Sequence, residues 1–320
     1  MIFIKRNNSV DKLEDWELVA SRESFTTSVD LSKKKLLDIF GYYELGEKKS
    51  CGIKSCRTPH KKGLLVVTED GIETNIGHKC GTNIFGVQFE KLAAELINKV
   101  NYFKSLTAIK EAKTKVWDYY NKAATLTVGD RNLHWVAHKI LDVKDVNIIG
   151  RSSYSQIMKL AGSGKDKITV SRRKSKEESD LDDVMKSNVY ESDFVSDDDS
   201  SSDTKPKYEN VVIGTLQHCD SVLIDYDVAL IYERDIKQVI DTLNSCDPDK
   251  MHTNKLIALH NKVARLEERI SFVTDRINKS RVFLTQKNFA AFAFKINGQR
   301  NVSFKDKERL SSFISSLPET

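Results

Sequence analysis

Three cysteines and two histidines fall within residues 51–80 of a 320-residue chain that has five cysteines and seven histidines in all. They stand in the order Cys51-x4-Cys56-x3-His60 and His78-x-Cys80-Gly81. Zinc prefers thiolate and imidazole ligands, four at a time in a tetrahedron. The spacing therefore predicts one Zn²⁺ that joins two short segments lying apart in the sequence.

For the ligand set we expect Cys51, Cys56, His60 and Cys80, with His78 as the alternative fourth ligand. His60 follows a proline, which stiffens its approach, whereas His78 lies one residue before Cys80 on the same face of a strand-like stretch. Gly81, directly after the last cysteine, is expected to let the backbone bend there. The choice between the two histidines stays open.

A catalytic zinc needs an open coordination position and a nearby acid or base. Glu69 and Glu73 lie between the ligand segments, but neither stands in a His-x-Glu or His-Glu-x-x-His context. The pattern therefore favours a structural zinc, and we expect the chain not to be an enzyme.

The order of a knuckle, a hairpin and a ligand-bearing turn that leads into a helix resembles a treble-clef zinc finger over residues 51–95. The first gap, four residues, is longer than the usual two in such fingers. The sequence pattern is also similar to that of a zinc module in uncharacterised phage and bacterial proteins. The residues that carry this resemblance are Cys51-Gly-x3-Cys56-x2-Pro59-His60-x2-Gly63 and Ile76-Gly77-x2-Cys80-Gly81. That resemblance implies an accessory role in a phage or mobile element.

A basic surface is expected beside the zinc, because residues 48–63 contain no acid. The natural use of such a surface is contact with phosphate groups, and the alternative is a solvated face without a partner. The residues expected to contact nucleic acid are Lys48, Lys54, Arg57, Lys61 and Lys62.

The fold class we predict is mainly α with a small zinc-bound β-hairpin, long helices and a possible antiparallel coiled coil. Asp30 or Ser32 is expected to cap a short helix near residues 33–40, and Asp70-Gly71 marks the hairpin turn. The expected segments are 1–50, an N-terminal segment; 51–87, the zinc-binding hairpin module; 88–161, a helical region with a long helix over 88–126; 162–207, a disordered acidic linker; 208–248, a strand plus a helix; 249–286, a coiled-coil-like helix; and 287–320, C-terminal helices.

Apolar residues recur at three- and four-residue spacing from Leu256 to Ile277, with charges on the flanks. One interpretation is a helix that packs on its own chain, for instance antiparallel to the helix over 88–126. The other is a homodimer that forms through residues 249–286.

Charge is unevenly distributed along the chain. Residues 177–203 hold eleven acids and one base, a net charge of −10. The other residues therefore carry a net charge of +15, which gives the whole chain its +5. A basic body favours anionic partners. No apolar run is long enough for a membrane span or a secretory leader, and the odd number of cysteines is typical of a reducing compartment, so we expect a cytoplasmic protein without membrane contact.

These observations predict a non-enzymatic zinc-finger protein that binds nucleic acid or another anionic macromolecule. The alternative is a protein–protein adaptor or inhibitor that acts through its coiled-coil helix and acidic linker, with zinc purely structural. Strong salt dependence of binding distinguishes the first from the second.

Overall fold

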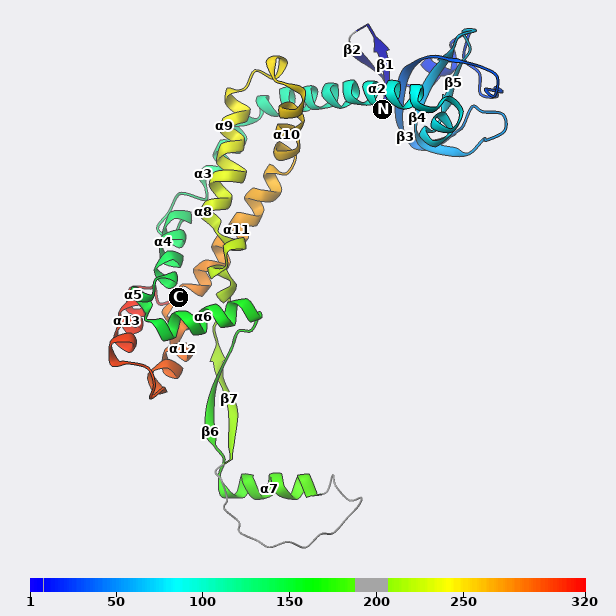
Figure 1. Ribbon diagram of the computed structural model, residues 1–320. Coiled ribbons are helices and arrows are strands. Elements are labelled where there is room, and N and C mark those ends of the chain that lie inside the picture. Colours follow the sequence, from blue (N-terminus) through cyan, green and yellow to red (C-terminus); the bar gives the residue numbers. More distant parts are fainter. Residues whose placement is uncertain (8, 188–206) are drawn as a thin grey trace. The chain divides into compact units, whose positions relative to one another are not determined.

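The structure, a computed structural model, describes residues 1–7, 9–187 and 207–320 (Figure 1). The chain divides into two units. The first comprises Met1–Tyr119 with Val239–Arg265, and the second comprises Tyr120–Gln238 with Leu266–Thr320. Each unit is described by itself.

The first unit is built on a five-stranded antiparallel sheet in the order β2-β1-β3-β4-β5. Its strands are β1 (Ile2–Arg6), β2 (Ser9–Leu13), β3 (Leu36–Ser50), β4 (Pro59–Thr68) and β5 (Glu73–Ile76). The predicted Asp-Gly turn is present between β4 and β5, with Gly71 at a φ of 79°. This hairpin is therefore only part of a larger sheet.

The expected fold, mainly α with a small β-hairpin, is wrong, because helices account for 57% and strands for 19%. The short helix expected near residues 33–40 is also wrong, since β3 starts at Leu36. Its buried residues Ile39 and Tyr43 belong to different cores, because register shifts between Leu36 and Asp38 and between Ile39 and Gly41 interrupt the two-residue period of the strand. The bulges leave apolar residues at spacings that imitate a helix.

Both faces of the sheet are covered, which is why β4 reads as a continuous apolar run. Leu64 and Val66 belong to a core that includes Phe89 of helix α2 (His78–Thr114), whereas Leu65 belongs to a second cluster with Tyr43. Successive side chains of a strand point to opposite faces, so one strand supplies both cores.

Helix α2 contains a break at Gly86, where φ is 60° and ψ is −141°. The helix expected over 88–126 is thus the second part of α2, followed after Lys115 by α3 (Val116–Ala124). In the same unit Ser105 of α2 hydrogen-bonds His260 of α10 (Thr253–Val263) at 3.0 Å. The unit also holds short elements: α1 (Glu17–Ala20), most of α9 (Gln238–Ser245) and the 3₁₀ turn η4 (Pro248–Lys250).

The stretch expected as one coiled-coil-like helix forms two helices, α10 and α11 (Leu266–Phe283), because the helix is interrupted at Ala264 and Arg265. The apolar residues of this stretch are no more than 9% exposed within the chain itself: Leu256, Leu259, Val263, Leu266, Ile270, Val273 and Ile277. A homodimer through residues 249–286 stays a prediction.

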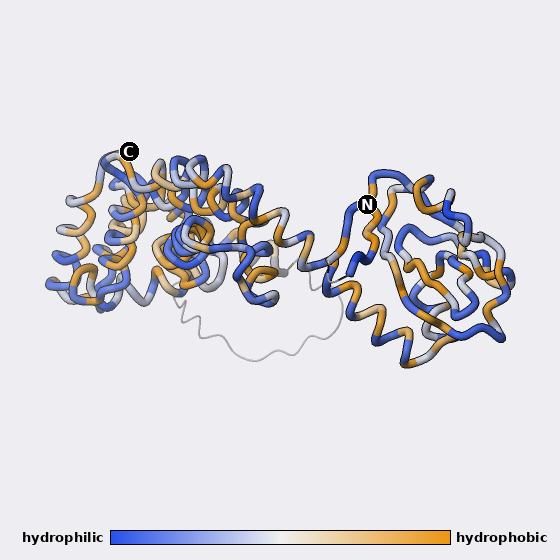
Figure 2. Tube along the Cα trace, turned by 90° about the horizontal axis from the view of Figure 1, so that it is seen from above, coloured by the Kyte–Doolittle hydropathy of each residue, from blue (hydrophilic) through white to orange (hydrophobic). Residues whose placement is uncertain are grey.

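The second unit is mostly helical. Phe289 lies at the centre of its aromatic packing, with ring centroids 5.2 Å from Phe283, 6.2 Å from Phe292 and 5.9 Å from Phe313. Along the trace, apolar and polar residues alternate within each helix (Figure 2). Its further helices are α4 (Leu133–Lys144), α5 (Val146–Ile149), α6 (Arg151–Ser163), α7 (Lys176–Ser187), α8 (Val228–Ile231), α12 (Gln286–Gly298) and α13 (Phe304–Ser315), with 3₁₀ turns η1 (Cys219–Val222) and η2 (Ile224–Tyr226) and a π-helical turn η3 (Tyr232–Lys237).

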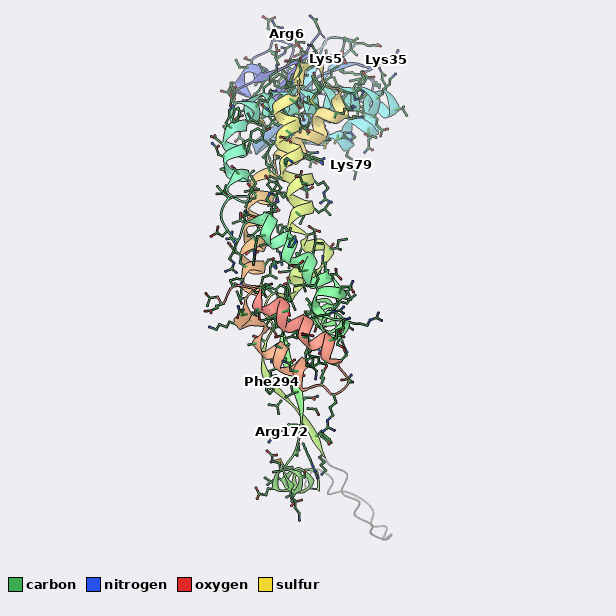
Figure 3. The ribbon with its side chains drawn as sticks, turned by 90° about the vertical axis from the view of Figure 1, so that its left-hand side faces the viewer. Lys5, Arg6, Lys35, Lys79, Arg172 and Phe294 are labelled. Atoms are coloured by element: carbon green, nitrogen blue, oxygen red, sulfur yellow. The ribbon has the colours of Figure 1, made fainter. Side chains whose placement is uncertain are left out.

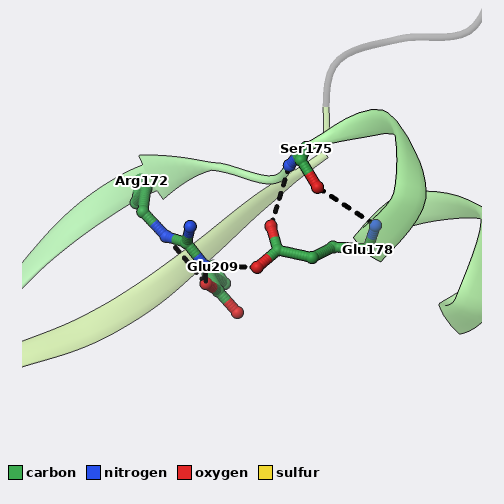
Figure 4. A network of polar contacts seen from close by, with 4 residues as sticks. All are labelled: Arg172, Ser175, Glu178 and Glu209. Atoms are coloured by element: carbon green, nitrogen blue, oxygen red, sulfur yellow. Dashed lines mark hydrogen bonds and ion pairs between the residues drawn. The ribbon is translucent and has the colours of Figure 1, made fainter.

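A two-stranded antiparallel ribbon, β6 (Lys167–Arg173) with β7 (Tyr208–Thr215), belongs to the second unit. Arg172 forms ion pairs with Glu209 across the ribbon and with Glu178 of α7, and Glu178 accepts a 2.8 Å hydrogen bond from the Ser175 main-chain nitrogen (Figure 4). The expected linker 162–207 is therefore wrong over residues 167–187. Most of its acidic remainder, residues 188–206, lies outside the described residues.

None of the helices that the structure describes is long and apolar enough to cross a membrane.

Candidate metal centre

The first two cysteines lie on a tight turn that follows β3. The main-chain nitrogens of Cys56 and Arg57 both donate to the Ile53 oxygen, at 3.1 and 3.3 Å, and the Cys51 nitrogen donates to the Thr58 oxygen at 3.1 Å. Arg57 has a positive φ of 53°, the left-handed conformation that reverses the chain. The four residues between the cysteines are thus folded into a knuckle closed by its own backbone.

Gly52 fixes this knuckle to the sheet. Its nitrogen donates to the Asn75 oxygen of β5 at 2.7 Å. A Cβ at this position would lie 1.9 Å from Oγ1 of Thr74, a distance that no side chain can adopt. A glycine is therefore required for the close approach of the two segments.

The third cysteine arrives on the first turn of α2, which His78 begins. The next residue, Gly81, is helical and buried, and a Cβ there would lie 2.1 Å from the ring of Phe89. The expectation that Gly81 bends the backbone at the ligand is wrong. Its small size instead lets the Phe89 ring pack against the turn that carries Cys80.

These two segments bring three thiols together. The Sγ atoms of Cys51, Cys56 and Cys80 all lie within 4.8 Å of one another, and those of Cys56 and Cys80 are 3.4 Å apart. Zn–S bonds of about 2.3 Å in a tetrahedron separate neighbouring sulfurs by about 3.8 Å, so this triad needs little adjustment to hold a metal ion. The three cysteines are free thiols, and Cys51 is fully buried.

The local environment shifts the pKa values of two of the thiols in opposite directions. Hydrogen bonds from the Thr58 hydroxyl and main chain lower the pKa of Cys56 to about 7. Burial raises the pKa of Cys80 to about 12, and its hydrogen bond with Cys56 adds to that shift. One thiol of the pair is thus readily ionised, whereas the other needs a cation beside it to lose its proton.

Neither histidine belongs to the thiol triad in the described residues. His78 is exposed, and its ring contacts Phe89 edge-on at a centroid distance of 5.6 Å. His60 lies on β4, half-buried, and burial lowers the pKa of its imidazole. The structure thus assembles three of the four expected ligands.

His60 takes part in a buried polar network. Its Nδ1 atom is 2.8 Å from the hydroxyl oxygen of Tyr43, which also accepts a 3.1 Å hydrogen bond from Nδ2 of Asn75. The other ring nitrogen, Nε2, is buried without a hydrogen-bond partner in the described residues. It faces Gly77, whose ideal Cβ position is 3.5 Å away, three residues before Cys80.

The predicted basic residues are exposed, and four of them have no ion-pair partner among the residues that the structure describes: Lys48, Lys54, Arg57 and Lys61. The fifth, Lys62, pairs with Glu44 at 2.6 Å. The salt bridge neutralises Lys62, so it is the weakest of the five as a contact for an anion.

Sequence reasoning missed one basic residue at the site. Lys79, drawn with Lys5 and Lys35 in Figure 3, is exposed and directly precedes Cys80. It lies outside the acid-free window of residues 48–63, but its position between His78 and Cys80 was a sufficient signal.

Comparison with known proteins found no relative: the chain matches no protein-family model, no curated protein and no solved structure.

Proposed function

We propose that the first unit is a zinc-stabilised nucleic-acid-binding module without enzymatic activity. Cys51, Cys56 and Cys80 would hold the ion, and His60 would supply the fourth donor. The positive charges beside the ion would contact phosphate groups. The observation that carries the proposal is that Lys54 lies between the proposed ligands Cys51 and Cys56, and that Arg57 directly follows Cys56.

The donor set supports zinc over harder cations. Three thiolates suit zinc and other soft ions, whereas magnesium and calcium require oxygen ligands. The unpartnered, buried Nε2 of His60 supports this residue as the fourth donor, since a ligating histidine usually donates the N–H of its other ring nitrogen to a hydrogen-bond acceptor, here from Nδ1 to the Tyr43 hydroxyl oxygen. When bound, zinc supplies a crosslink between the knuckle and the start of α2.

A structural rather than catalytic role is supported by the surroundings of the triad. Among the described residues, no carboxylate belongs to the 4.8 Å group of thiols. A hydrolytic zinc site needs such a group to accept a proton from bound water.

Charge supports an anionic partner. The first unit has 24 basic and 19 acidic residues, a net +5. The knuckle holds Lys54 and no acid, Arg57 directly follows it, and Lys79 adds a third cation beside Cys80. Since metal binding would fix the backbone that carries these side chains, the positions of the charges would depend on the metal.

The test is binding of fluorescein-labelled single- and double-stranded DNA and RNA to the zinc-loaded chain, followed by anisotropy from 50 to 200 mM salt. We expect the double variant Lys54→Ala/Arg57→Ala to weaken binding and to reduce the slope of log K against log salt by about 2, one unit for each lost phosphate contact. Lys255→Ala is the matched control, because Lys255 is an exposed lysine of α10 in the same unit.

Binding that ignores salt and the double variant, in a chain that still contains stoichiometric zinc, would overturn the nucleic-acid proposal. In that case the adaptor alternative becomes the better account, since an adaptor needs no phosphate contacts.

A further inference from the structure

The second unit contains a cavity of about 690 Å³ that the proposed function does not use. Its walls come from the end of α11, the start of α12, strand β7 and the loop before α4. Cavities that bind small molecules typically measure about 300–1,000 Å³. The size thus permits a small-molecule ligand.

Two arginines at this cavity hold one another in place. Nη2 of Arg131 donates to the main-chain oxygen of Arg281, and Nε of Arg281 donates to the main-chain oxygen of Arg131 at 2.7 Å. Nη1 of Arg131 donates to the Thr320 main-chain oxygen at 2.8 Å. Main-chain oxygens therefore position both guanidinium groups, and the oxygen of Thr320 belongs to the terminal carboxylate of the 320-residue chain.

Positive charge in the cavity exceeds the single negative charge of its lining, the terminal carboxylate of Thr320. Lys287 adds a third cation, and the lining includes no aspartate or glutamate side chain. Nε of Arg131 is buried and has no hydrogen-bond partner in the described residues. Burial and the neighbouring charge of Arg281 lower the pKa of Arg131, as expected for like charges held together.

Part of the remaining wall is apolar. Ile213, Val282 and Ala290 line the cavity, and an ideal Cβ at Gly214 would lie 2.6 Å from that of Ala291. The close contact of β7 with α12 therefore leaves no room for a larger residue at Gly214. A ligand here would meet both apolar groups and hydrogen-bond donors.

We propose that this cavity binds a small molecule with an anionic oxygen group, phosphate or carboxylate, on an apolar body. The anionic group would accept hydrogen bonds from the guanidinium groups and Lys287, which match the oxygens of either anion. The apolar body would cover Ile213, Val282 and Ala290. Such a ligand would add negative charge to a lining in which three cations outnumber one carboxylate.

The experiment is isothermal titration calorimetry of the full chain with octyl phosphate, octanoate, inorganic phosphate and 1-octanol. We expect one-to-one binding of octyl phosphate, octanoate or both, and the tighter of the two identifies the anionic group. Inorganic phosphate and 1-octanol should each bind at least about tenfold more weakly, because each lacks one half of the recognised chemistry; tenfold corresponds to about 1.4 kcal/mol.

Two pairs of variants make the test specific. Ala290→Glu places a carboxylate beside the cations and should abolish binding, whereas Ala290→Gln, of the same size but neutral, should retain it. Lys287→Ala should weaken binding about tenfold, and Lys159→Ala, an exposed lysine of α6 outside the cavity, should not. Ala290 is exposed on α12, so its variants are expected to fold, which thermal unfolding checks.

Absence of saturable binding by both anionic probes at millimolar concentration overturns the proposal. Equal affinity for 1-octanol and octyl phosphate, or unchanged affinity in Ala290→Glu, also overturns it.

Discussion

The sulfurs of Cys56 and Cys80 lie 3.4 Å apart although 24 residues separate them in the sequence. A whole hairpin, β4 and β5, connects the two residues, and Cys80 stands on the helix that follows. Two unligated thiols gain little from such proximity, since an S–H group is a weak donor. A metal ion explains the arrangement, because it would bind both sulfurs and that of Cys51.

Replacing Gly81 tests whether the start of α2 is built to hold Cys80. In Gly81→Ala the new methyl group would meet the buried ring of Phe89, so we expect a loss of about 1–3 kcal/mol in the free energy of unfolding, as for other overpacked cores. We also expect weaker metal binding, because Cys80 is the neighbouring residue. Urea denaturation with and without zinc measures both effects.

The matched control is Gly162→Ala. Gly162 is also helical, in α6, but a Cβ there meets nothing within 4 Å. This substitution should stabilise the chain by about 0.5–1 kcal/mol, since alanine favours a helix over glycine. Similar effects of the two substitutions would contradict the packing argument.

The sequence predicted the grouping of the three cysteines better than the fold. The spacing of the cysteines was informative because thiols close together in a sequence often bind a metal. The Asp-Gly pair predicted the turn of the β4–β5 hairpin. Strand β3 was missed because its bulges break the two-residue period. The order of the strands in the sheet could not be predicted either, because β1 pairs with β3 across more than 30 residues and local sequence patterns do not encode such pairing.

The fourth ligand shows a different limit. Spacing admits both His60 and His78, and it says nothing about which ring nitrogen is free. The structure supplies that information: Nδ1 of His60 is bound to Tyr43, and its Nε2 has no partner in the part of the chain that is described. Contacts of this kind depend on the packed sheet and not on local sequence.

We predict that His60 and not His78 completes the metal site. Cobalt substituted for zinc reports its ligands through its visible absorption bands. His60→Ala should shift these bands and weaken cobalt binding about 10- to 100-fold, because a nitrogen ligand is lost, whereas exposed His78→Ala should leave both unchanged. The opposite pattern would identify His78 as the ligand.

The second unit should lose stability at alkaline pH because of Cys219. Burial raises the pKa of this thiol to about 11, and its Sγ donates to the Lys165 oxygen at 3.6 Å. From the ordinary pKa of 9.0 up to about 11, the folded state keeps a proton that the unfolded state has lost. The stabilisation is therefore fully present below pH 9 and falls as pH rises, by roughly 1–3 kcal/mol.

Urea denaturation of the wild type and of Cys219→Ala between pH 7.5 and 10.5 checks this prediction. The variant should be less stable at neutral pH, because it leaves a small cavity, but its stability should decline less steeply above pH 9. Parallel decline of the two proteins would show that other groups control the alkaline transition.

The central claim is that Cys51, Cys56 and Cys80 hold one zinc ion, and metal analysis of the purified chain tests it most directly. We predict one zinc per chain in the wild type and in Cys246→Ser, a cysteine outside the triad, and much less than one in Cys51→Ser, Cys56→Ser or Cys80→Ser. Chelation should lower the thermal midpoint of the wild type by roughly 10 °C, because a tightly bound ligand contributes about 4 kcal/mol. A wild-type chain without stoichiometric metal after purification from zinc-supplemented cells, or unchanged zinc content in all three triad variants, would contradict the claim.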